Sequence, residues 1–136
     1  MGYRSDVAYT IRFVSDHDER NKQSFYTFLA EAKAKAATAL CFGGRDRNNF
    51  EVDERNFRIN FSALDVKWYE SYPDVQCHEA LIALANEWVE DTDNNAEVGY
   101  MFVRIGEEND DTEEKCGGEY DWDWLRVSRT IVADWL

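Results

Sequence analysis

The chain has 136 residues, of which 44% are hydrophobic and 15% aromatic, and its formal net charge is −13. These values predict one domain over residues 1–136 with a single core, and they exclude a disordered acidic polymer. The apolar runs are too short for a membrane span, and the first residues lack the apolar segment of a secretory signal, so we expect a soluble, intracellular protein.

The first half of the chain predicts a strand followed by a helix. Residues 6–15 (DVAYTIRFVS) alternate apolar side chains with other types, which is typical of a strand with one buried face. Residues 24–40 (SFYTFLAEAKAKAATAL) contain strong helix formers and apolar side chains at spacings of three and four. Gly43 and Gly44 are expected to end this helix.

The middle of the chain predicts one long bent strand, or two strands, and a second helix. Residues 49–71 (NFEVDERNFRINFSALDVKWYES) carry the alternating Phe57, Ile59 and Phe61. The second helix is expected over residues 74–92 (DVQCHEALIALANEWVEDT), with Asp74 as its N-cap.

The last third predicts a clear strand over residues 96–109 (AEVGYMFVRIGEEN). An acidic loop over residues 106–119 (GEENDDTEEKCGGE) follows, with Gly117 and Gly118 as a hairpin turn. Residues 120–136 (YDWDWLRVSRTIVADWL) are expected to form one or two strands, or a strand and a short helical turn.

This order of elements predicts an α+β fold with two helices on one face of a mainly antiparallel sheet. A ferredoxin-like βαββαβ core with an extra C-terminal strand is the first choice. A different strand order in an α+β sheet is the alternative.

The charge is strongly asymmetric along the chain. Residues 1–70 contain 11 acids and 11 bases, whereas residues 71–136 contain 17 acids and 4 bases, so the second part carries the whole excess. Such a surface is either a solvated, solubilising face or a binding site for a basic partner. The acidic character argues against direct binding to nucleic acid or to an anionic membrane, because both require lysine and arginine.

The sequence offers no catalytic constellation, and we predict no catalytic residue, cofactor or metal site. His17 lies between two aspartates and could act as a base, but an exposed turn histidine is the simpler interpretation. His78 follows Cys77, and neighbours on a helix point in different directions. The three cysteines are far apart, which favours free thiols packed as small apolar groups in a reducing compartment over a zinc site.

The segment EYDWDWL alternates aromatic and acidic side chains. Tyr120, Trp122 and Trp124 alternate with Asp121 and Asp123, which predicts a strand with an aromatic inner face and an acidic outer face. The outer acids would extend the carboxylate surface of residues 107–114, and exposed aromatic side chains could anchor a partner.

Three segments carry a resemblance to a known group of proteins: MGYRSDVAY, DVKWYESYPDV and YMFVRIGEENDDTE. They resemble segments that occur in the same order in small acidic tailed-phage proteins, and they cover under a third of the chain. The resemblance brings no active site, but it implies a phage-encoded or prophage-encoded protein in the host cytoplasm. Small acidic phage proteins without catalytic motifs are often inhibitors of CRISPR complexes, restriction enzymes, polymerase or gyrase.

We therefore expect a non-enzymatic inhibitor, of anti-CRISPR, anti-defence or DNA-mimic type, that binds a basic nucleic-acid-handling host protein. The expected contacts are Glu107, Glu108, Asp110, Asp111, Glu113, Glu114, Tyr120, Asp121, Trp122 and Asp123. The alternatives are a small enzyme acting on nucleotides or nucleic acid, with His17 or a carboxylate-held metal at its site, and a phage structural or assembly component.

Overall fold

The computed structural model describes residues 2–35, 49–94, 96–108, 110–121, 123–127 and 131–135. Its elements, in chain order, are β1 Ser5–Phe13, α1 Asp18–Lys35, β2 Glu51–Asp53, β3 Arg58–Val66, α2 Pro73–Glu90, a 3-10 turn η1 Thr92–Asn94, β4 Val98–Gly106, β5 Thr112–Gly118, β6 Leu125–Val127 and β7 Ile131–Ala133.

Five of the seven described strands form a sheet in the order β2-β3-β1-β4-β5, with every neighbouring pair antiparallel. β1 is central, and Tyr9 lies opposite Phe61 of β3 and Phe102 of β4. The order β2-β3-β1-β4 is that of a ferredoxin-like βαββαβ core, and β5 extends it at the β4 edge. The predicted α+β class, the βαββαβ order and the extra strand are confirmed.

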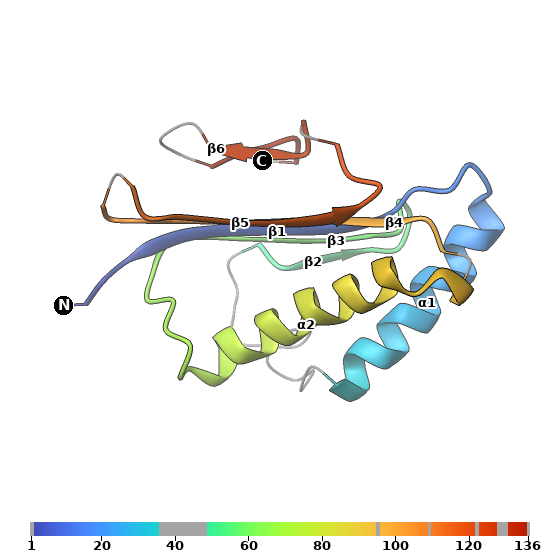
Figure 1. Ribbon diagram of the computed structural model, residues 1–136, viewed down its shortest axis with the longest axis horizontal. Coiled ribbons are helices and arrows are strands. Elements are labelled where there is room, and N and C mark those ends of the chain that lie inside the picture. The colour runs from blue at the N-terminus through green and yellow to red at the C-terminus, as the bar shows by residue number, and fades with distance from the viewer. Residues whose placement is uncertain are drawn as a thin grey trace.

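Three layers result from this topology. Figure 1 shows α1 and α2 together on one face of the sheet and the β6–β7 pair on the other. The sequence predicted the helical layer, but it did not predict that the last strands pair with each other and cover the second face.

The helix boundaries follow local chemistry. α1 begins at Asp18, six residues earlier than expected, with acids in its first turn and lysines in its last. The predicted end of this helix, with Gly43 and Gly44, lies outside the described residues. α2 begins at Pro73, whose fixed φ suits a first turn, and Tyr72 occupies the N-cap position without a side-chain cap. The prediction of Asp74 as N-cap is therefore wrong.

The core lies on both faces of the sheet. On the helix side, Tyr9, Phe61 and Phe102 are fully buried, and the Tyr9 and Phe61 ring centroids are 5.1 Å apart. On the other side, a second cluster consists of Ala8, Met101, Val103, Leu125, Ile131 and Ala133. β1 is thus buried on both faces, and the expected single buried face is wrong. Among the described residues, no helix combines the length and the apolar character needed to cross a lipid bilayer.

Candidate functional site

The acidic segment is built as a turn and a strand instead of the expected loop. β4 ends at Gly106, the chain turns, and Thr112 begins β5, which pairs with β4 through Gly118. Gly117 and Gly118 lie within β5, so the expected hairpin turn at these glycines is wrong. The strand matters for the site because its period of two sends alternate side chains to opposite faces.

Alternation divides the acids of β5 between two environments. Glu114 is exposed, together with Thr112 and Cys116, whereas Glu113 and Lys115 are half-buried on the side of α2. Half of the strand's carboxylates are therefore turned away from open solvent.

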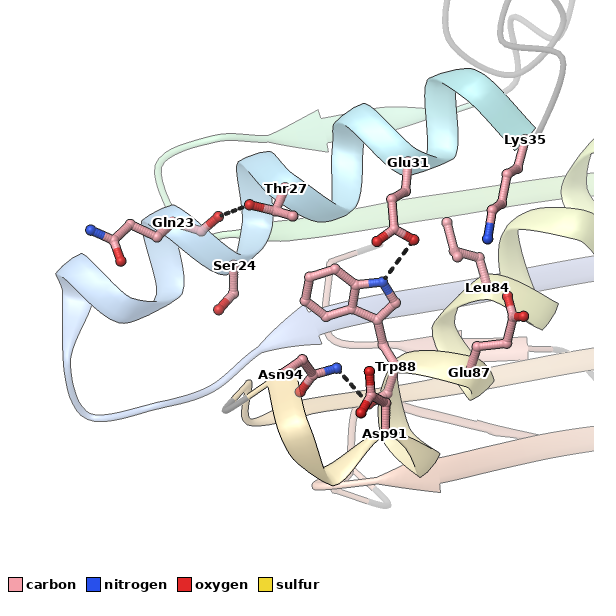
Figure 2. A pocket seen from close by; sticks show the side chains of 10 residues that line it. All are labelled: Gln23, Ser24, Thr27, Glu31, Lys35, Leu84, Glu87, Trp88, Asp91 and Asn94. Atoms are coloured by element: carbon pink, nitrogen blue, oxygen red, sulfur yellow. Dashed lines mark hydrogen bonds between the residues drawn. The ribbon is translucent and has the colours of Figure 1, made fainter.

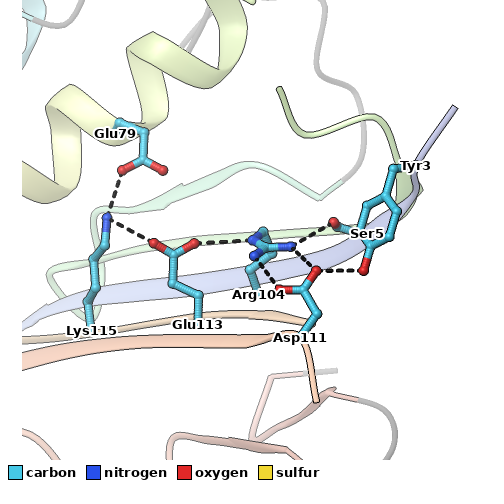
Figure 3. Close-up of polar contacts among 7 residues, drawn as sticks. All are labelled: Tyr3, Ser5, Glu79, Arg104, Asp111, Glu113 and Lys115. Carbon is cyan, nitrogen blue, oxygen red and sulfur yellow. Dashed lines mark hydrogen bonds and ion pairs between the residues drawn. The ribbon is translucent and has the colours of Figure 1, made fainter. Parts of the chain in front are cut away.

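The half-buried acids belong to a chain of ion pairs (Figure 3). Lys115 Nζ lies 2.9 Å from Glu79 Oε2 and 3.6 Å from Glu113 Oε2. Arg104 then donates from Nε to Glu113 Oε1 at 3.1 Å and from Nη2 to Asp111 Oδ1 at 2.8 Å. Asp111 and Glu113 are thus neutralised by the chain's own bases. The expected continuous acidic surface is interrupted at these two positions.

Asp111 is the best-connected carboxylate of the segment. Besides the Arg104 bonds, it accepts a hydrogen bond of 2.6 Å from the Tyr3 hydroxyl through Oδ2. The bond from Arg104 lowers the pKa of Asp111, and the bond to Asp111 in turn raises the pKa of Tyr3. Asp111 therefore remains ionised and fixes the first residues of the chain against the β4–β5 turn.

The remaining predicted acids are exposed, and none has an ion pair within the described part of the chain. They are Glu107, Glu108, Asp110, Glu114, Asp121 and Asp123. Glu119, which the sequence analysis did not include, is exposed as well. We call these seven residues the β5 acidic edge, because they occupy the turn before β5, the strand itself and the segment directly after it.

Two of these carboxylates make hydrogen bonds to the backbone. Glu107 accepts the Arg4 amide at 3.0 Å, and Asp121 accepts the Asp123 amide at 2.8 Å. These bonds hold the side chains in place without cancelling their charge.

The expected aromatic anchors are not exposed together. Tyr120 is half-buried and packs against the second cluster, which includes Met101 and Val103, so its expected role as an exposed anchor is not confirmed. Trp122 lies outside the described residues.

The second face of the sheet contains a polar cluster around the buried side chain of Arg12, which the sequence analysis missed. Arg12, 5% exposed, donates from Nη2 and Nη1 to the two carboxylate oxygens of Asp134 at 2.6 and 3.1 Å. Its Nε donates to Thr10 Oγ1 at 3.0 Å, and its guanidinium lies 4.6 Å from the Trp124 ring centroid. An arginine in the middle of an apolar strand was the available signal. These contacts attach the β6–β7 layer to β1.

The histidines and cysteines do not form a reactive pair in the described residues. His17 is exposed before α1, whereas His78 is fully buried, with Nδ1 2.6 Å from the Tyr9 hydroxyl. Cys77 is buried and disulfide-bonded, and Cys116 is a free, exposed thiol. The expectation of buried free thiols is therefore wrong for both, and Cys41 lies outside the described residues. Within the described ranges, no group of three or more potential ligands could hold a metal ion.

A polar cleft of about 500 Å³ lies between α1 and α2 (Figure 2). It contains the carboxylates of Glu31, Glu87 and Asp91, and the Trp88 indole donates to Glu31 Oε2 at 3.3 Å. That bond joins the two helices. We read the cleft as a polar junction between the helices and assign no chemistry to it.

A second hollow, of about 540 Å³, lies between α2 and β5. Ile82, Ala83 and Tyr100 give it an apolar part, and Asn86 accepts a hydrogen bond of 2.8 Å from the Tyr100 hydroxyl. Glu114, Lys115 and Cys116 of β5 form its rim. The hollow thus adjoins the β5 acidic edge.

Comparison of the chain with protein-family models, curated proteins and solved structures found no match. The resemblance to tailed-phage proteins accordingly stays an expectation from three sequence segments, and any function must be argued from the residues themselves.

Proposed function

We propose that this protein is a non-enzymatic, phage-encoded inhibitor that binds a basic, nucleic-acid-handling host protein through the β5 acidic edge. The observation that supports the proposal is the exposure of seven carboxylates along one strand and its two flanks, with no ion pair for any of them within the described ranges. Asp111 and Glu113 are removed from the contact set because Arg104 holds both.

The carboxylates of the β5 acidic edge are concentrated at the two ends of the strand. The seven residues of β5 span about 24 Å at the usual rise per residue, and over that length one strand of nucleic acid carries about seven phosphates. β5 itself contributes only Glu114 to the edge, and the other six acids lie in the turn before it and in the segment after it. The strand is therefore less densely charged than nucleic acid, and a partner would meet the charge mainly at its two ends.

Electrostatics explain why such a surface is useful only with a partner. Exposed carboxylates repel one another, and water and counterions screen that repulsion in the free protein. A cationic groove removes the repulsion and releases the counterions. Complementary charge of this kind increases the association rate and makes binding sensitive to salt.

The proposal is tested by capture from host lysate, followed by purification of the captured protein. A triple variant, Glu107→Lys, Glu108→Lys and Asp110→Lys, should lose the partner, whereas the matched variant Asp16→Lys, Glu19→Lys and Glu54→Lys should retain it. Both variants change the net charge equally, and all six residues are exposed. Binding of the purified partner should weaken by at least about tenfold between roughly 0.1 and 0.5 M NaCl.

Three results would contradict the proposal. The two variants could lose the partner equally, which would show an effect of net charge alone. Nucleotide or nucleic-acid turnover that disappears in His17→Ala would identify an enzyme. Incorporation of the chain into virions would identify a structural component.

A further inference from the structure

The outer side of β5 is an open strand edge. β5 is the last strand of the sheet, and β4 occupies only one of its two sides. The Gly106 amide donates to the Asp111 carbonyl at 2.8 Å, and the Glu119 amide donates to the Val98 carbonyl at 3.1 Å. These two bonds fix the phase of the ladder, because hydrogen-bonded pairs alternate along an antiparallel pair.

This phase determines which backbone groups point outward. The residues between the bonded ones direct their N–H and C=O groups away from β4. They are Thr112, Glu114, Cys116 and Gly118. Thr112 already donates its amide to the Asp110 carbonyl at 3.1 Å, whereas within the described part of the chain no such bond reaches the backbone of Glu114, Cys116 or Gly118.

The two edges of the sheet are unequal. β2, at the opposite edge, has three residues, whereas β5 has seven and continuous register with β4. Short strands, bulges, prolines and charged side chains are the usual protection of an edge. β5 lacks the first three, and its charged side chains Glu113, Glu114 and Lys115 disfavour an acidic or purely apolar strand but leave the edge open to a strand that carries basic residues.

A strand added to β5 would meet a different surface on each face. Its side chains on the helix side would lie over the hollow whose apolar part is formed by Ile82, Ala83 and Tyr100. Its side chains on the opposite face would lie beside Glu114, with the other acids of the edge beyond both ends. The two faces therefore favour apolar and basic side chains in alternation.

We propose that β5 binds an extended segment of the partner as a sixth strand of the sheet, and that this segment alternates apolar residues with lysine or arginine. Strand addition of this type takes affinity from main-chain hydrogen bonds and specificity from alternate side chains. The inference rests on the proposed function, for which it specifies the binding mode. A second copy of the chain is a poor occupant, because each copy carries −13 and two acidic edges would face each other.

The test uses the full chain and a synthetic peptide of alternating valine and lysine with blocked ends. Two control peptides carry the same charge: one has methylated backbone nitrogens on the pairing side, and the other has the same residues in two separate blocks. Fluorescence anisotropy should show binding of the alternating peptide and affinity lower by at least about tenfold for both controls. Amide exchange should slow at Glu114 and Cys116 and stay unchanged at Glu113 and Lys115, which already bond β4.

A variant pair tests the edge from the protein side. Cys116→Pro removes an outward N–H without removing a bond to β4, and Cys116→Ala is its matched control. The proline variant should lose the peptide and the alanine variant should retain it. If circular dichroism shows that the proline variant is misfolded, the comparison with the methylated peptide alone tests strand addition.

Equal binding of the alternating and methylated peptides would overturn strand addition. So would retention of the peptide by a folded Cys116→Pro variant. Binding of the host partner to the two kinds of variant distinguishes failure of strand addition from failure of the proposed function. A partner that is lost on charge reversal at residues 107, 108 and 110 but kept by Cys116→Pro would leave the acidic edge as the binding surface without an added strand.

Discussion

The guanidinium of Arg12 is a buried charged group that makes three hydrogen bonds within the described chain. It is buried, paired in bidentate fashion with Asp134, bonded to Thr10 and stacked near Trp124. Only the arginine side of the pair is buried, since the Asp134 side chain is 43% exposed. Loss of Asp134 would leave a buried charge without its counter-ion, whereas loss of Arg12 would leave a carboxylate that water can solvate. The residue therefore controls whether the β6–β7 layer stays attached.

Replacement of Arg12 by alanine should lower the free energy of unfolding by about 2 kcal/mol, since the pair with the partly exposed Asp134, a hydrogen bond to Thr10 and an aromatic contact are lost together. The matched variant Arg20→Ala removes an exposed pair with Glu97, whose atoms are 4.0 Å apart, and should change stability by less than about 0.5 kcal/mol. Urea unfolding measures both. Equal effects would show that Arg12 has no special role.

The partner carboxylate gives stability a defined pH dependence. The hydrogen bond from Arg12 lowers the pKa of Asp134 in the folded state. A lowered folded-state pKa adds stability above the unfolded value of about 3.9, and this stability is lost as the pH falls toward the folded value.

The difference in unfolding free energy between the wild type and Asp134→Asn should thus be constant from about pH 7 to pH 5 and shrink below about pH 4. Urea unfolding at several pH values measures it. The same comparison in an Arg12→Ala background is the control, because the largest cause of the lowered pKa of Asp134 is removed there. A difference that grows on acidification would refute the assignment.

The sequence predicted six of the seven acids of the β5 acidic edge, all except Glu119, but it could not predict which acids of the segment are neutralised. Arg104 reaches Asp111 and Glu113 only because β4 and β5 pair in a register that places Arg104 opposite Glu113. Cross-strand pairing of this kind depends on register, and register cannot be read from charge counts.

At the scale of elements, β5 shows why strand prediction failed in the acidic segment. A half-buried strand is recognised by apolar side chains at every second position. In TEEKCGG both alternate sets are polar or small. β4 was predicted correctly because Tyr100 and Phe102 face the helices while Met101 and Val103 face the second cluster. The edge strand is held by its pairing and its ion pairs, and neither leaves a period-two signal.

The β6–β7 pair tests whether the third layer belongs to the cooperative core. Leu125 is fully buried, whereas Leu64 is 63% exposed. Leu125→Ala should lower the free energy of unfolding by about 3 kcal/mol through lost contacts and a cavity. The control Leu64→Ala should stay within about 0.5 kcal/mol. Thermal unfolding measures both. A small effect of Leu125→Ala would mean that the layer detaches before the sheet unfolds.

For the whole molecule, self-repulsion opposes folding. The chain holds 28 acids and 15 bases, and compaction brings the excess carboxylates closer together. Raising NaCl from roughly 0.01 to 0.3 M should therefore raise the melting temperature, because screening shortens the range of the repulsion to about 6 Å or less.

The triple lysine variant at residues 107, 108 and 110 should show a smaller salt effect than the wild type, since each substitution replaces a negative charge by a positive one. Scanning calorimetry at two salt concentrations makes the comparison. A melting temperature that falls with salt would indicate that internal pairs such as Lys115–Glu79 outweigh the repulsion.

The element order was accessible from sequence because helices and buried strands carry strong periodic signals. The third layer was not, since two strands of three residues each are shorter than any reliable period. The acids of the candidate site were identified by type, while their exposure, spacing and pairing required the sheet.

The central position of β1 has a consequence for biosynthesis. During synthesis β1 must wait for β3 and then β4 before it is paired on both sides, and the Arg12 guanidinium waits for a carboxylate 122 residues later. Chains dominated by such distant contacts fold slowly, because loop closure precedes the stabilising contacts. β1 therefore remains an unpaired apolar strand until β3 and β4 have been synthesised, and Arg12 lacks its carboxylate until the chain has passed β7.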